Sequence, residues 1–117
     1  MKNITIDDPM YFQTLHLVLD CGYDEFVKIV KNATGTDLST ECHRDADATY
    51  FLIPYEGTEV CYIWMEKFDK STVVVAQLIH ELYHHAVYAL KNVDVKSEEA
   101  TAYYLQYLVS QALTNLA

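Results

Sequence analysis

The spacing of apolar residues predicts a strand followed by a helix in the first third of the chain. Within Tyr11–Asp20, leucines alternate with other side chains in a run rich in β-forming residues, which is typical of a strand. Between Tyr23 and Ala33, apolar side chains recur at helical spacing and charged residues fill the other face. That pattern predicts an amphipathic helix ending near Gly35.

The middle of the chain predicts a polar loop and then a β-hairpin. Residues 36–48 are mostly polar and carry several acidic side chains, so we expect no regular structure there. Two short β-rich runs follow, Tyr50–Ile53 and Val60–Met65, with Pro54 and Gly57 between them as turn residues. Two such runs joined by a short turn favour an antiparallel pair.

The last third predicts two long helices. Ser71 or Thr72 can cap the first, which runs to about Lys91 and is apolar almost all round in its first two turns. A helix of that kind is expected to be central in its domain. After a short connection, Ser97 can cap a second helix over 98–116.

The order of these elements favours an α+β fold. Strand, helix, two strands and two helices follow one another without an internal repeat or a linker. We therefore expect a single domain over residues 1–117, with a small, largely antiparallel sheet packed on helices around one continuous core.

The net charge and the composition exclude some classes of binding partner. The chain carries 17 acidic against 8 basic side chains, a net charge of −9. Such a charge repels phosphate backbones and anionic lipids, so we expect neither nucleic acid nor membrane as a partner. The first residues contain no apolar run that could serve as a signal peptide, and no later stretch reaches the ~20 apolar residues of a membrane helix. A cytoplasmic location is expected.

The three cysteines fit that expectation. Cys21, Cys42 and Cys61 form no CxxC pair, and their odd number in a reducing compartment indicates free thiols. Free cysteine is among the most buried residue types, so a structural place in the core is expected for them.

The segment His80-Glu81-Leu82-Tyr83-His84 carries the strongest chemical signal. On a helix, positions i and i+4 share a face, so His80 and His84 can direct two imidazoles at one Zn²⁺ ion. Glu81 then lies beside the metal, where its carboxylate can act as the general base that takes a proton from the attacking water. His85 is out of register with His80 and is expected to be a supporting or exposed residue.

A third protein ligand is expected from the next helix. Glu98 and Glu99 open that helix, and we favour Glu99 as the metal ligand because a small residue, Ala102, follows it one turn later. Glu98 and Asp94 stay as alternatives. A simpler interpretation is that acidic residues stabilise the first turn of any helix, by 0.3–1 kcal/mol. The corresponding simple interpretation of the motif is a pair of surface histidines, with an ion pair between Glu81 and His85.

The HELYH segment and the later Glu99-Ala100-Thr101-Ala102-Tyr103 together resemble the gluzincins, zinc peptidases with HExxH plus a glutamate. The nearest resemblance is to small metallopeptidase-like proteins of phages and prophages, over residues 71 to 108. It implies zinc ligands at His80, His84 and Glu99, a catalytic base at Glu81, and a minimal zincin-like domain. It also implies an edge strand above the site, here Glu59–Glu66, that holds an extended peptide.

Two functions follow from these expectations. The first is a zinc-dependent endopeptidase that acts on a protein or peptide, although the chain lacks the second lobe of thermolysin-like enzymes and an identified donor to the oxyanion. Tyr62, Tyr83, Tyr103 and Tyr104 are candidates for that donor. The second is a non-catalytic, zinc-stabilised module that binds a phage or host protein. A third interpretation is a structural protein without metal.

Overall fold

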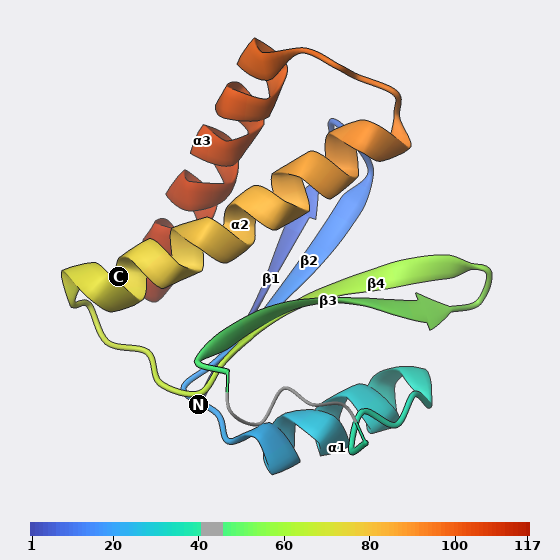
Figure 1. Cartoon of the computed structure of the whole chain (residues 1–117), viewed down its shortest axis with the longest axis vertical. Helices are drawn as coiled ribbons and strands as arrows, with labels where there is room; N and C mark the ends of the chain where they lie inside the picture. Colours follow the sequence, from blue (N-terminus) through green and yellow to red (C-terminus); the bar gives the residue numbers. More distant parts are fainter. Residues whose placement is uncertain (41–45) are drawn as a thin grey trace.

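The computed structural model describes residues 1–40 and 46–117 and shows one four-stranded sheet with three helices (Figure 1). The elements are β1 (Lys2–Asp8), β2 (Gln13–Leu19), α1 (Tyr23–Thr34), β3 (Ala48–Tyr55), β4 (Thr58–Met65), α2 (Thr72–Asn92) and α3 (Glu98–Leu116). The α+β class is confirmed. Every helix and strand expected from the sequence is present, and β1 is an addition to them.

The strands lie in the order β1-β2-β4-β3. The two outer pairs, β1 with β2 and β3 with β4, are antiparallel, whereas the central pair of β2 and β4 is parallel. The expectation that residues 59–66 form the edge strand is wrong, because β4 is central and β3 is the edge. The sequence carries a reason for this order: Pro54 lies within β3, and a proline cannot donate to a neighbouring strand.

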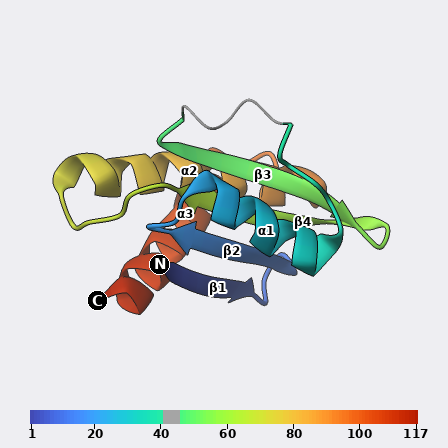
Figure 2. The same ribbon diagram turned by 90° about the horizontal axis from the view of Figure 1, so that it is seen from below.

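Helices cover both faces of the sheet, with α1 on one and α2 and α3 on the other (Figures 1 and 2). The expected single core is therefore divided in two. Alternate residues of β2 separate it: Leu15, Leu17 and Leu19 pack under α2 and α3, while Val18 packs with Trp64 and Phe26 under α1. Because strand side chains alternate between faces, this central strand must be apolar on both.

The ends of the helices and of the β3–β4 hairpin are explained by capping and turn residues. The Ser71 and Ser97 hydroxyls accept hydrogen bonds from the backbone N–H groups at the starts of α2 and α3, which confirms both as N-caps. Gly35 closes α1 in the left-handed conformation, with φ of 79°. Glu56 and Gly57 join β3 to β4 with φ of 50° and 79°, which suits the tight turn of a hairpin.

The remaining expectations are placed as follows. Cys21 and Cys61 are free and buried, as expected, whereas Cys42 lies outside the described residues, as does part of the loop expected over 36–48. In the part of the chain that the structure describes, no helix has the length and apolarity needed to cross a bilayer.

Candidate metal centre

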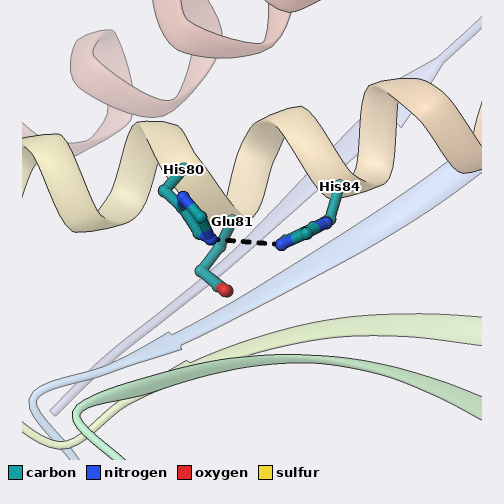
Figure 3. A group of neighbouring side chains, drawn as sticks. All are labelled: His80, Glu81 and His84. Carbon is teal, nitrogen blue, oxygen red and sulfur yellow. Dashed lines mark hydrogen bonds between the residues drawn. The ribbon is translucent and has the colours of Figure 1, made fainter.

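His80 and His84 lie one turn apart on α2, and both are exposed (Figure 3). Their Nε2 atoms are 3.2 Å apart and their rings are nearly perpendicular. Two nitrogens bound to one zinc ion at ~2.0–2.1 Å with a tetrahedral angle lie about 3.3–3.4 Å apart. The two imidazoles are therefore already spaced as a pair of ligands to one ion.

Glu81 differs from the two histidines in its burial. Its side chain is only 7% exposed, and its Oε2 atom is buried without a hydrogen-bond partner. Burial raises the pKa of the Glu81 carboxyl, and the neighbouring His84 and His80 offset part of that rise. A buried carboxylate oxygen without a partner is costly, which favours a chemical role for Glu81 over a structural one.

The three residues form a group that fits a divalent ion. One ligand atom from each of His80, Glu81 and His84 lies within 4.8 Å of the others. All three side chains project from α2 on the side of the sheet, while α3 lies on the other side of α2 (Figure 3). Two imidazoles beside a carboxylate are a donor set suited to Zn²⁺, and similar sets bind other divalent transition metals.

The glutamates of α3 are not brought to this group. Glu98 and Glu99 are exposed in the first turn of α3, and Asp94 pairs at 3.8 Å with exposed Lys96 in the preceding connection. Among the described residues, the group that could hold an ion contains only His80, Glu81 and His84. The assignment of Glu99 as third ligand stays a prediction from the sequence that this arrangement of helices does not favour.

His85 belongs to the core. It is 1% exposed, and its Nδ1 atom lies 2.7 Å from the hydroxyl of Tyr50 on β3. Burial lowers the pKa of His85 to about 4, although Asp8 acts in the opposite direction. The residue is thus not exposed as the sequence allowed; it joins the motif helix to the edge strand from the inner face of α2.

A cavity of about 630 Å³ opens beside the motif and is lined by His80 and Glu81. One wall is formed by Ala48, the first residue of β3, and by Asp47, which precedes it. The first turns of α2 form another wall through Thr72, Val73, Ala76 and Gln77. Its volume is within the range of small-ligand sites in proteins. No role was predicted for Asp47, which is one of several acidic residues in a polar stretch of the sequence.

None of the four tyrosines considered as an oxyanion donor lines this cavity. Tyr62 is buried in the core under α1, on the opposite face of the sheet. Tyr104 is buried between α3 and the sheet, and Tyr103 is 68% exposed on α3. Tyr83 is on α2 but lines a separate groove where α2 meets α3.

Comparison of the chain with protein-family models, with curated proteins and with solved structures finds no match. The resemblance to gluzincins therefore stays a prediction from the motif. What can be inferred about function comes from the geometry of His80, Glu81 and His84 and of the cavity beside them.

Proposed function

We propose that this chain is a cytoplasmic, zinc-dependent metallopeptidase that hydrolyses a peptide bond of a protein or peptide. One observation carries the proposal: two imidazole nitrogens 3.2 Å apart lie within 4.8 Å of a carboxylate oxygen of the buried Glu81. A pair of histidines with a purely structural role does not require a carboxylate beside it. A hydrolytic site does, because it needs a base next to the metal.

Each residue has a distinct role in this mechanism. His80 and His84 would hold the ion through their Nε2 atoms. A zinc ion bound there would polarise the scissile carbonyl and acidify a water molecule. Glu81 accepts the proton of the attacking water and delivers it to the leaving amine. Its raised pKa suits this exchange, because a base is most effective when its pKa approaches the working pH.

The edge strand β3 offers a surface on which a substrate can be held. Within the described residues, β3 pairs with β4 on one side only, and Ala48 at its start lines the cavity beside His80. An extended peptide can pair with the free edge of such a strand through backbone hydrogen bonds. We propose that β3, in place of the strand expected from the sequence, presents the substrate.

The direct test is Glu81→Gln in the zinc-loaded protein. Peptide cleavage should fall by about 10²–10⁴-fold, the usual contribution of a general base. Zinc content should stay near that of the parent protein, because His80 and His84 are intact. Glu56→Gln, which removes an exposed carboxylate at the β3–β4 turn, is the control and should leave cleavage unchanged. Undiminished cleavage in Glu81→Gln would exclude this mechanism.

The third ligand has a test of its own. Because Glu99 is exposed and outside the group, Glu99→Gln should leave zinc affinity close to that of the parent, whereas His84→Ala should abolish stoichiometric binding. The measurement is competition for zinc against a coloured chelator. A loss in Glu99→Gln comparable to that in His84→Ala would restore Glu99 as a ligand and require α3 to approach the motif.

A second candidate is a non-catalytic, zinc-stabilised module that binds another protein. The observation that favours it is the cavity lining, in which no tyrosine is positioned as an oxyanion donor. For such a module, zinc should raise the melting temperature while no peptide is cut by the parent protein at any zinc concentration. Cleavage that is lost in Glu81→Gln separates the two functions.

A further inference from the structure

The first strand, β1, lies at an edge of the sheet and lacks the residues that commonly protect an edge. Within the described residues it pairs only with β2, and it is at the opposite edge from β3, whose first residue lines the cavity beside the motif (Figure 2). Unlike β3, which contains Pro54, β1 contains neither proline nor glycine, and Ile4-Thr5-Ile6 at its centre are all β-branched. Its outer side therefore offers backbone N–H and C=O groups to another strand.

The charges of β1 are distributed so that two antiparallel copies complement each other. Exposed Lys2 begins the strand, and Asp7 and Asp8 end it. Antiparallel pairing centred on Thr5 brings the basic end of each copy to the acidic end of the other, with exposed Asn3 directly opposite exposed Asp7. Every residue then faces one of the same parity, so each side chain stays on its own face of the sheet. Parallel pairing would instead set like charges together.

Helix α3 extends this edge with an uncharged surface. The Tyr107 hydroxyl donates to the Asp7 carbonyl oxygen at 3.2 Å, so α3 lies along β1. Tyr103, one turn earlier on the same side of α3, is 68% exposed. No charged residue occurs in 100–117, although the chain has 17 acidic and 8 basic residues. Protein interfaces are enriched in tyrosine and depleted of charge at their centre, and each partner typically buries about 800 Å², more than one strand edge supplies.

We propose that two copies of this chain associate through β1, antiparallel and centred on Thr5, so that their two four-stranded sheets form one continuous sheet. Such a contact has two-fold symmetry, the commonest symmetry of protein dimers, and it closes on itself without leaving either β1 edge free. The α3 helices of the two copies then flank the seam. Because β3 is at the far edge of each sheet, the candidate metal centre stays open, and the inference does not depend on the proposed function.

The test is sedimentation equilibrium of the metal-free chain and of two variants with opposite charges at Asn3. The parent should form a dimer. Asn3→Lys places a cation opposite Asp7 at two equivalent positions and should tighten the dimer about fivefold, whereas Asn3→Asp places like charges there and should weaken it by a similar factor. Thr58→Lys and Thr58→Asp change the net charge equally at the exposed start of β4, so these matched controls should have much smaller effects.

Crosslinking tests the register of the two strands. Because Thr5 lies opposite its own copy, Thr5→Cys should be joined to its partner by a short bismaleimide, whereas Thr58→Cys should not. Both substitutions are made together with Cys42→Ser, since the other two cysteines are buried. A parent chain that stays monomeric would overturn the inference and leave the β1 edge to a different protein. A dimer in which the Asn3 variants behave like their Thr58 controls, or in which residue 5 is not crosslinked, would equally overturn it.

Discussion

Glu81 combines a cost to stability with the chemical role proposed for it. Its carboxylate is 7% exposed and has an oxygen without a partner, and desolvation raises its pKa. A buried charged group without a partner destabilises the fold that holds it. Residues selected for reactivity commonly reduce stability in this way, and replacing them can make a protein more stable.

This cost predicts the effect of Glu81→Gln on stability. In the metal-free protein at neutral pH, the neutral amide should raise the free energy of unfolding by about 1 kcal/mol, because the desolvated charge is removed. Urea denaturation with a chelator present measures the change. The exposed Glu56→Gln substitution is the matched control and should change stability by less than about 0.5 kcal/mol. A clear loss of stability in Glu81→Gln would mean that the carboxylate has a structural partner.

His16 predicts a dependence of stability on pH. Its ring stacks on Tyr62 with centroids 5.0 Å apart, and burial lowers its pKa, while Asp7 offsets part of that effect. A histidine with a lowered pKa binds protons more readily in the unfolded chain, so acid favours unfolding. The free energy of unfolding should therefore fall as pH decreases from 7 to 5, through the ordinary histidine pKa of about 6.5.

The contribution of His16 can be separated from that of His85, whose pKa is lowered to about 4 and which acts in the same direction. Urea unfolding of the metal-free protein at several pH values should show a weaker dependence in His16→Gln than in the parent. His85 contributes to the residual dependence, and the Glu81 carboxyl, whose pKa is raised, opposes it. Identical pH profiles for the parent and His16→Gln would show that His16 is equally protonated in the folded and the unfolded chain.

Among the elements, α2 and β3 are joined by a side-chain contact next to the candidate metal centre. The Tyr50 hydroxyl on β3 meets the Nδ1 atom of His85, which immediately follows His84 on α2. Tyr50→Phe would leave that buried nitrogen without a partner, at a cost of about 1–3 kcal/mol. Urea denaturation checks this value. Tyr55→Phe, at the exposed end of the same strand, is the control and should be close to neutral.

The elements themselves could largely be predicted from the sequence, because each has a strong periodic or capping signal. α1, α2 and α3 have apolar spacing and end signals within a few residues of their observed limits. β1 was not predicted, since it contains only two apolar residues, Ile4 and Ile6, and an outer strand can be stabilised by pairing with its neighbour. The alternation of those two isoleucines with polar residues is the signal that was available.

The order of strands and the surroundings of the motif could not be predicted in the same way. Periodicity reports which residues are buried, but not which neighbour covers them, so the central position of β4 and the division of the core followed only from the structure. The pair of His80 and His84 was predictable, because it depends on helix geometry alone. The place of Asp47 depends on the packing of α2 against β3, which no local pattern encodes.

For the molecule as a whole, the candidate metal centre lies at the surface of a fold that has two cores of its own. One core lies under α1 and the other under α2 and α3, and neither includes His80 or His84, which are exposed. The fold therefore does not require the ion to bury its apolar residues. Metal binding should add to the stability of an already folded protein, in contrast to small zinc modules that unfold without metal.

This contrast gives a quantitative prediction for metal removal. A ligand that binds only the folded state stabilises it by RT ln(1 + [L]/Kd), about 2.7 kcal/mol at a free concentration of 100 times Kd. Stripping zinc should lower the melting temperature by the corresponding amount and leave a cooperative transition. His80→Ala should remove the dependence on zinc while melting like the metal-free parent, because the exposed imidazole contributes little to packing.

Thermal unfolding across a range of free zinc concentrations, followed by circular dichroism, distinguishes this site from general attraction of cations to an acidic surface. A chain with a net charge of −9 attracts any divalent ion, so magnesium at the same concentration is the necessary control. If zinc stabilises His80→Ala as much as the parent, or if magnesium replaces zinc, the stabilisation comes from surface charge and not from the two histidines. Stabilisation by zinc that requires both His80 and His84 would establish the centre independently of any catalytic activity.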